Sequence, residues 1–138
     1  MHPPRSGRVT LGGFAHLPRL LDKARAHLVG KAGDYHYNCP LDEEFFEFTG
    51  INHEAMLAEI KKGGSDSDVL AWVQANTKVT AYQISNWSTW IIQHGPGGTP
   101  GHTWIAGMIA TSSAVRSDIR SFADVLDMDD YTSFGGKA

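Results

Sequence analysis

Residues 14–28, FAHLPRLLDKARAHL, decide the fold of this chain. The apolar side chains in this stretch recur three or four positions apart, which is the spacing of one face of an α-helix. They are Phe14, Leu17, Leu21, Ala24 and Leu28. Pro18 is compatible with the first turn of a helix, and the glycines at positions 30 and 33 favour its end. The sequence therefore predicts a first helix over residues 14–28.

Four further helices are predicted between residue 40 and the glycine- and proline-rich residues 95–101. Each begins at a residue whose side chain or ring suits a helix start: Pro40 or Asp42, Asn52, Ser65 with Asp68, and Thr80 with Gln83. Gly50 ends the first of the four, and Gly63 with Gly64 ends the second. Heavy apolar side chains follow every start, so each helix has a face to bury.

Residues 95–101, GPGGTPG, interrupt the helical pattern and predict a loop that acts as a connector or a lid. Two more helices are predicted beyond it, over residues 104–109 and 115–126. Residues 1–13 are expected to form an extended arm, and residues 129–138 a flexible or partner-packed tail. The fold class is all-α: a compact single domain over 14–128, with about six or seven short helices joined by Gly- and Pro-rich connections.

Composition excludes several classes of protein. The chain has 138 residues, 41% of them hydrophobic, 20% charged and one a cysteine, with a net charge of −3. These values are typical of a single globular domain, and the absence of a basic cluster argues against a nucleic-acid partner. A lone cysteine favours a reducing compartment, and no segment resembles a signal peptide or a membrane span, so we expect a cytoplasmic protein.

Three stretches together resemble a known family. They are LDKAR at residues 21–25, the tyrosine-rich run that ends in Pro40-Leu41-Asp42, and the pattern of Asp68, Leu70 and Trp72. Over roughly residues 11–90 the chain is similar to the bacterial family catalogued as domain of unknown function 5069. The resemblance implies a small helical protein, and it implies no activity for any residue.

The candidate site is the polar run at residues 34–39. Asp34, Tyr35, His36, Tyr37, Asn38 and Cys39 stand in consecutive positions, and all can donate, accept or titrate. His36 with Asp34 would form an acid/base pair, because imidazole titrates near neutral pH and a carboxylate can orient it. Cys39 would be a reserve nucleophile, with His36 as its base. The alternative is structural: a turn at Asp34 and Asn38, and a buried thiol at Cys39.

Substrate binding is predicted on both sides of His36. Lys23 and Arg25 precede the polar run and would hold a small anion, while Tyr35 or Tyr37 would orient it. The alternative is that these cations are solvated and that the tyrosine rings pack in the core. His36 and Cys39 have a spacing that could give two metal ligands, but no recognised ligand pattern completes the set. We therefore predict neither a metal nor a cofactor.

Two functions follow from these residues. The first is a cofactor-independent enzyme, a hydrolase or a lyase, that performs acid/base chemistry on a small anionic molecule at residues 34–39. The second is a non-catalytic helical module that binds a metabolite or a protein. A homo-oligomer built through the late helices and the tail is a further expectation.

Overall fold

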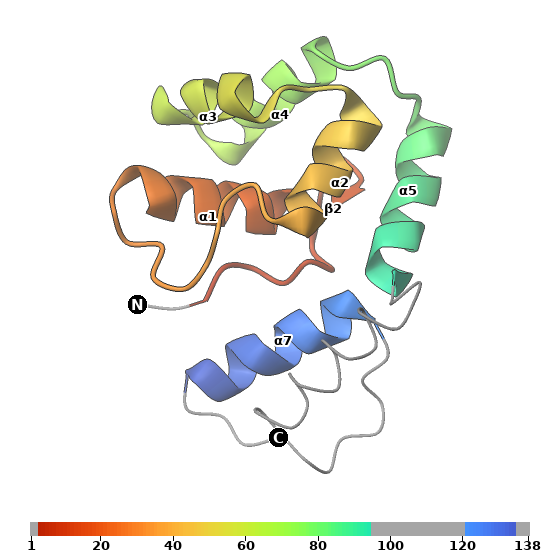
Figure 1. Ribbon diagram of the computed structural model, residues 1–138. Helices are drawn as coiled ribbons and strands as arrows, with labels where there is room; N and C mark the ends of the chain where they lie inside the picture. The colour runs from red at the N-terminus through yellow and green to blue at the C-terminus, as the bar shows by residue number, and fades with distance from the viewer. Residues whose placement is uncertain (1–2, 95–120, 135–138) are drawn as a thin grey trace.

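The computed structural model describes residues 3–94 and 121–134, apart from the side chain at position 132. These residues form six α-helices and one hairpin (Figure 1). The helices are α1 (Leu17–Leu28), α2 (Pro40–Thr49), α3 (His53–Lys61), α4 (Asp66–Ala75), α5 (Ala81–Gln93) and α7 (Phe122–Ser133). The hairpin pairs β1 (Thr10–Leu11) with β2 (Phe14–Ala15) in antiparallel fashion. The all-α class predicted from the sequence is confirmed.

The first helix begins later than predicted. Phe14 lies in β2, and α1 begins only at Leu17. Gly12 and Gly13 have φ values of 58° and 84°, as the two central residues of a tight hairpin turn require. His16 has a φ of 70°, and this left-handed conformation separates the strand from the helix. Strands of two residues are too short to produce an alternating pattern, so periodicity could not reveal the hairpin.

The predicted helix starts at residues 52, 65 and 80 are confirmed. The Asn52 side chain accepts hydrogen bonds from two backbone N–H groups in the first turn of α3. Ser65 with Asp68 forms a reciprocal capping box at α4, and Thr80 with Gln83 forms another at α5. These interactions satisfy backbone donors that have no partner inside the helix.

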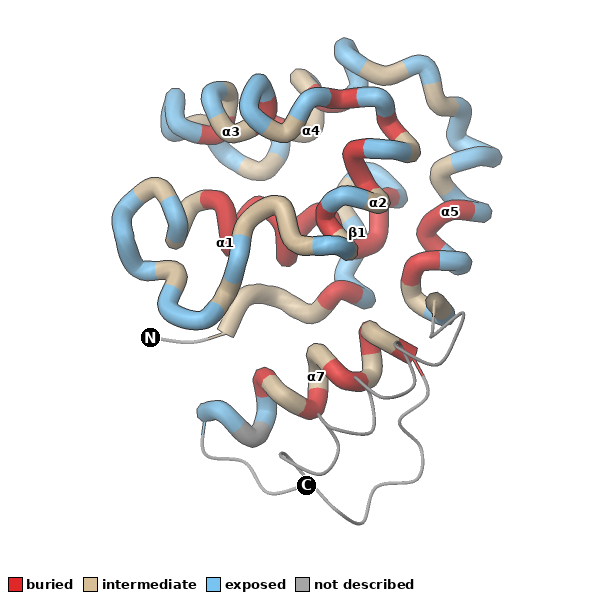
Figure 2. Tube along the Cα trace, in the orientation of Figure 1, coloured by how far each residue is buried: buried red, intermediate tan, exposed pale blue. Residues whose placement is uncertain are grey.

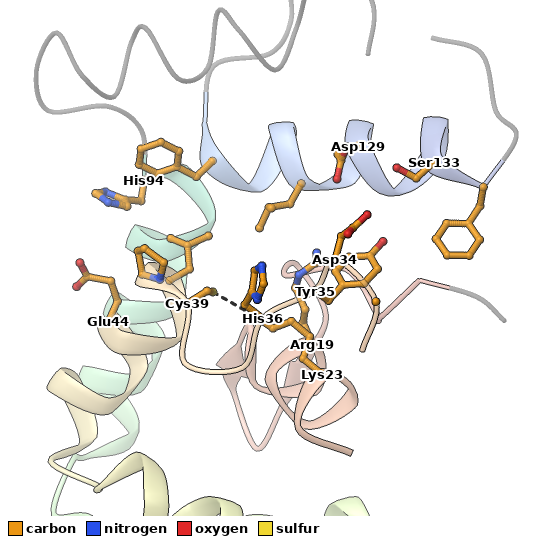
Figure 3. A pocket seen from close by; sticks show the side chains of 16 residues that line it. Arg19, Lys23, Asp34, Tyr35, His36, Cys39, Glu44, His94, Asp129 and Ser133 are labelled. Atoms are coloured by element: carbon orange, nitrogen blue, oxygen red, sulfur yellow. Dashed lines mark hydrogen bonds between the residues drawn. The ribbon is translucent and has the colours of Figure 1, made fainter. Parts of the chain in front are cut away.

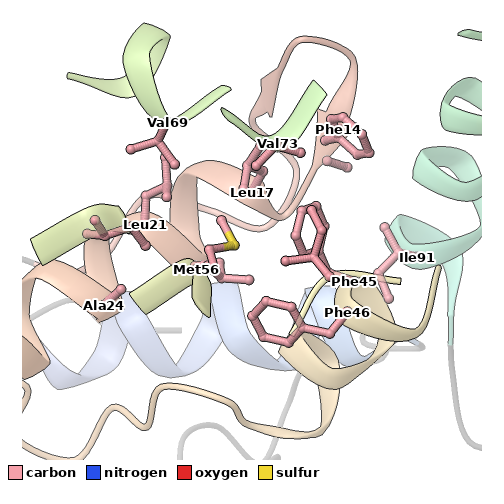
Figure 4. Packing of buried hydrophobic residues seen from close by; sticks show 14 of the residues in the cluster. Phe14, Leu17, Leu21, Ala24, Phe45, Phe46, Met56, Val69, Val73 and Ile91 are labelled. Atoms are coloured by element: carbon pink, nitrogen blue, oxygen red, sulfur yellow. The ribbon is translucent and has the colours of Figure 1, made fainter. Parts of the chain in front are cut away.

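The core joins the hairpin to the five helices from α1 to α5 (Figure 4). Phe14 and Phe45 are fully buried, and their ring centroids lie 5.5 Å apart in an edge-to-face arrangement. Phe48 stacks on Trp87 with 5.0 Å between the centroids. Figure 2 shows buried positions along the first half of α1, where residues 17–21 are all buried. Burial of each such side chain contributes about 1.5–3 kcal/mol, so this cluster fixes the position of the residues that α1 and α2 carry.

The segment expected as an extended arm makes ion pairs with three helices in its described part, residues 3–13. Arg5 bridges Asp22 of α1 at 3.0 Å and Asp66 of α4 at 2.8 Å. Arg8 pairs with Asp127 of α7 at 3.0 Å. These residues therefore join the start of the chain to its last described helix.

The later part of the chain is described only from residue 121. The predicted loop at 95–101, the predicted helix at 104–109 and the first residues of the helix predicted at 115–126 lie outside the described residues. The end of that last helix corresponds to α7, which continues to Ser133, into the segment expected as a tail. Within residues 3–94 and 121–134, no helix combines the length and the apolar character needed to span a bilayer.

Candidate functional site

A cavity of about 850 Å³ lies between α7 and the polar run (Figure 3). Its volume is in the range typical of small-molecule sites. Its described walls come from α1, the 33–39 segment, the start of α2, the end of α5 and α7. The polar groups among them are Arg19, Lys23, Asp34, Tyr35, His36, Cys39, Glu44, His94, Asp129 and Ser133.

Hydrogen-bond donors surround the Cys39 sulfur at one wall of this cavity. Cys39 is the N-cap residue of α2, where the backbone N–H of Asp42 points at its side chain in a capping box. The Lys23 ammonium donates to Sγ at 3.1 Å. A ring nitrogen of His16 lies within 4.8 Å of the sulfur. A sulfur at a helix N-terminus beside cationic donors is in the environment that favours a thiolate.

Behind the sulfur lies the carboxylate of Asp42, which is completely buried. Its Oδ2 accepts hydrogen bonds from Lys23 at 2.9 Å and from the backbone N–H groups of Asn38 and Cys39 at 3.0 and 3.3 Å. Its Oδ1 accepts from Lys23 at 3.0 Å and lies 2.6 Å from His16 Nε2. The carboxylate therefore aligns both the lysine and the histidine that contact the thiol.

His16 reaches this cluster through its unusual backbone. Its left-handed conformation carries a steric cost of about 1–3 kcal/mol for a residue with a side chain. Its backbone N–H donates to the carbonyl of Gly7 at 2.9 Å, which holds the residue in place. Only 2% of the residue is exposed, so the imidazole is shielded from bulk water.

The electrostatics of the cluster favour charge separation between Cys39 and His16. Burial raises the pKa of the thiol, but the hydrogen bond from His16 and the charge of Lys23 outweigh it, so the pKa of Cys39 lies below its ordinary value. Burial lowers the pKa of His16, but hydrogen bonds to Asp42 and Cys39 outweigh it and raise this pKa. Burial likewise opposes the Asp42 carboxylate, yet His16 and Lys23 hold its pKa below the usual range.

A thiolate at Cys39 together with an imidazolium at His16 gives the cluster the same net charge as the neutral thiol and imidazole do. Lys23 and Asp42 already compensate each other, and the resulting thiolate and imidazolium do the same. A neutral buried set avoids the desolvation cost of an isolated ion. The arrangement is that of an activated thiol with an orienting histidine and carboxylate.

Five of the residues predicted as site residues line the cavity: Lys23, Asp34, Tyr35, His36 and Cys39. Asp34 and His36 are both exposed at its wall, and the structure records no hydrogen bond between these two described side chains. Lys23 contacts the sulfur and Asp42. The histidine in contact with the thiol is thus His16, and His36 lies on the open side of the site.

Arg25 and Tyr37 are not brought to the cavity. Arg25 pairs with Asp66 at 2.6 Å on another part of the surface. The Tyr37 hydroxyl donates to the carbonyl of His53 at 2.7 Å, and burial raises the pKa of that hydroxyl. Residues two apart on a helix do not face each other, so Lys23 and Arg25 cannot both point at one ligand.

A second buried ion pair, which includes the cavity residue Arg19, joins α1 to α7. Arg19 of α1 donates to both carboxylate oxygens of Asp130 in α7, at 2.7 and 3.3 Å. The Tyr35 hydroxyl donates to the same carboxylate at 2.9 Å, and the guanidinium lies 5.6 Å from the centre of the Tyr35 ring. Burial, followed by the contact with Asp130, raises the pKa of Tyr35.

Sequence reasoning missed His16, Arg19 and Asp42 as parts of a site. Asp42 could have been noticed as a negative charge at a helix start. Arg19 could have been noticed because it lies four residues before Lys23, on the same helix face. Nothing in the local sequence marks His16, because its partners follow later in the chain.

Three residues of the cluster also have the donor atoms of a metal site. One ligand atom each from His16, Cys39 and Asp42 lies within 4.8 Å of the other two. Nitrogen, sulfur and oxygen donors of this kind suit zinc. The Lys23 ammonium, however, lies within 3.1 Å of the Cys39 sulfur and of Asp42, so it supplies the positive charge that a metal ion would bring.

Comparison with known proteins places the chain in a family without assigning an activity. No curated protein matches the sequence. The sequence model of the family described as "domain of unknown function (DUF5069)" matches residues 1–132, which includes the expected range of 11–90 and most of the region beyond it. The chain therefore belongs to the DUF5069 family.

Proposed function

We propose that this chain is a cysteine-dependent hydrolase of a small molecule, with Cys39 as the nucleophile. The observation that supports the proposal best is the environment of the sulfur. The Lys23 ammonium lies 3.1 Å from it, a backbone N–H points at it, a ring nitrogen of His16 lies within 4.8 Å, and Cys39 lines a cavity of about 850 Å³. Thiolates are the reactive form of cysteine, and this set of donors favours the thiolate.

The reaction begins when the thiolate attacks the carbonyl carbon of an ester or amide in the cavity. A carbon–sulfur bond forms, the bond to the leaving alcohol or amine breaks, and protonated His36 gives that group its proton. Neutral His36 then takes a proton from water, and the hydroxide adds to the thioester carbon. The carbon–sulfur bond breaks, the thiolate is restored, and the released acid passes its remaining proton to solvent.

His36 and Asp34 keep the acid/base role that the sequence suggests. Both line the cavity, and both are exposed, so a substrate or a water molecule can reach them. Asp34 would assist by binding the water molecule or the leaving group through its carboxylate. His16 is too deeply buried to exchange protons with a leaving group, and its task is to maintain the thiolate.

A reactive thiol requires a reducing environment, so this function belongs in a compartment such as the cytoplasm. The chain has one cysteine, and this makes any covalent intermediate simple to locate.

The test uses p-nitrophenyl acetate, a small activated ester. We expect release of nitrophenolate with turnover, and intact-protein mass spectrometry after acid quenching should detect one acetyl group on Cys39. Cys39→Ala should abolish both signals. His36→Gln should slow turnover by about 10²-fold or more, as expected when a general acid/base is lost. His27→Gln is the matched control, because His27 is exposed but does not line the cavity.

Turnover that survives in Cys39→Ala would contradict the covalent route and point to a lyase-like or general-base reaction. Absence of both turnover and acetylation, in a protein that is folded, would favour the non-catalytic binding module instead.

A further inference from the structure

Arg19 has an unused hydrogen-bond donor. Only 2% of this residue is exposed, and its terminal nitrogens are occupied by Asp130 and by the backbone carbonyl of Arg5. Its Nε–H has no hydrogen-bond partner among the described residues, and no other buried side-chain polar atom in that part of the chain lacks one. A buried donor without an acceptor costs free energy, so such a group calls for a partner that arrives later.

The position of Arg19 points to what that partner is. Arg19 lines the cavity (Figure 3) and lies one helical turn before Lys23, whose ammonium touches the Cys39 sulfur. Side chains four apart on a helix are neighbours. A small molecule whose reactive carbon is at the sulfur can therefore extend along α1 toward the Arg19 guanidinium.

The charges around Arg19 restrict the chemistry of the group it can accept. Asp130 already compensates the guanidinium charge, and Asp34, Glu44 and Asp129 also line the cavity. A phosphate dianion would be repelled by these carboxylates. A single negative charge spread over two oxygens, one of which can accept from Nε–H, fits better.

We propose that Arg19 is the substrate-binding residue for a carboxylate, so that the substrate is a small carboxylic acid that presents its reactive carbon to Cys39. This inference extends the proposed function, because it names the class of substrate for the same cavity. It also gives Arg19 the anion-binding role that the sequence predicts for Lys23 and Arg25.

Two alkylating agents of nearly equal size test the proposal: iodoacetate, which carries a carboxylate, and iodoacetamide, which is neutral. In both reactions the Cys39 thiolate attacks the methylene carbon, a carbon–sulfur bond forms, and iodide leaves with the electron pair of the broken bond. The ratio of the two rate constants isolates recognition of the carboxylate, because the thiolate is common to both reactions.

We expect the ratio of iodoacetate to iodoacetamide rates to be higher in the folded protein than in the chain unfolded in urea. Arg19→Lys keeps the charge beside Asp130 but has no Nε–H, and it should lower the ratio by about fivefold or more, as loss of a charged hydrogen bond predicts. Arg25→Gln is the matched control: this residue is an arginine on the same helix, paired with Asp66, and it does not line the cavity. The control should leave the ratio unchanged.

Asp130→Asn provides a change in the opposite direction. It removes the charge that compensates Arg19, so the ratio should rise, whereas simple loosening of α7 would not favour the charged reagent. An unchanged ratio in both Arg19→Lys and Asp130→Asn would overturn the carboxylate assignment. Failure of the proposed hydrolase is a separate result, because it would appear as an iodoacetamide rate no faster than in the unfolded chain.

Discussion

Replacement of Asp42 by asparagine tests the cluster most directly. The carboxylate is completely buried, and every group around it is a donor: Lys23, the backbone N–H groups of Asn38 and Cys39, and the imidazole of His16. An asparagine amide has nearly the same shape, but its NH₂ group would face donors in either orientation. The substitution also leaves the Lys23 ammonium, with 4% of its side chain exposed, without a counter-charge.

The expected loss is large compared with the stability of a domain of this size. Removal of one partner from a buried ion pair costs about 3–5 kcal/mol. At roughly 0.05–0.15 kcal/mol per residue, a chain of 138 residues has a free energy of unfolding of roughly 7–20 kcal/mol. Asp42→Asn should therefore remain folded in buffer and unfold at a much lower urea concentration. Urea titration followed by tryptophan fluorescence measures the difference, since Trp87 is packed on Phe48 in the core.

Asp66→Asn is the matched control. Asp66 also pairs with two cations, Arg5 and Arg25, but 30% of its side chain is exposed. Exposed ion pairs contribute about 0–1 kcal/mol each, so this variant should lose little stability. If Asp42→Asn were within about 1 kcal/mol of the wild type, or no less stable than the Asp66→Asn control, Asp42 would not be the organising charge of the cluster.

Three further outcomes are expected. The rate of Cys39 alkylation by iodoacetamide should rise with pH, with a midpoint below 9.0, which is the ordinary pKa of the thiol. His16→Gln should move this midpoint to higher pH. A wild-type midpoint at or above pH 9.0 would exclude the activated thiolate. The folded-state pKa of His16 is raised above 6.5, so its contribution to stability is fully present below pH 6.5 and is lost as the pH rises through the higher folded value. The gap between the urea midpoints of wild type and His16→Gln should therefore narrow with rising pH, and a gap that widens would contradict the sign of the shift. Lys23→Ala removes the ammonium that lies beside the possible metal ligands of His16, Cys39 and Asp42. This variant should therefore bind Zn²⁺ more tightly than the wild type does, as measured by competition with a chromogenic chelator. Equal affinities would show that Lys23 does not replace a metal ion.

Sequence patterns were sufficient for the helices whose ends are set locally. A capping box needs only residues three positions apart, as Ser65 and Asp68 illustrate, so its signal is complete within one turn. The hairpin at Gly12 and Gly13 is equally local, but its strands are too short for a period to be visible. Helix starts were therefore predicted correctly where a side chain caps them, and wrongly at Phe14, where the backbone turns first.

The site was only partly predictable, because the sequence pattern shows which residues share a helix face and does not show which residues from elsewhere in the chain pack against that face. Arg19 and Lys23 belong to a charged face of α1 that normally meets solvent. Both are buried here, because Asp130 covers one and Asp42 the other. Asp130 is 111 residues from Arg19 in the chain, and no local rule connects them. His16 could not be predicted as a site residue for the same reason, because its partner Asp42 lies 26 residues later in the chain.

The distances along the sequence between the site residues also divide the site into two parts that can form independently. Cys39, Asp42 and His16 lie within 26 residues of one another, so closing their loop costs little conformational entropy. The ion pair between Arg19 and Asp130, which joins α1 to α7, requires closure over 111 residues. Contacts between near neighbours in sequence form early in folding, and distant ones form late. A chain whose synthesis has not yet reached α7 would thus already hold Cys39, Asp42 and His16 together, while the side of the cavity that α7 supplies forms only after α7 has been made.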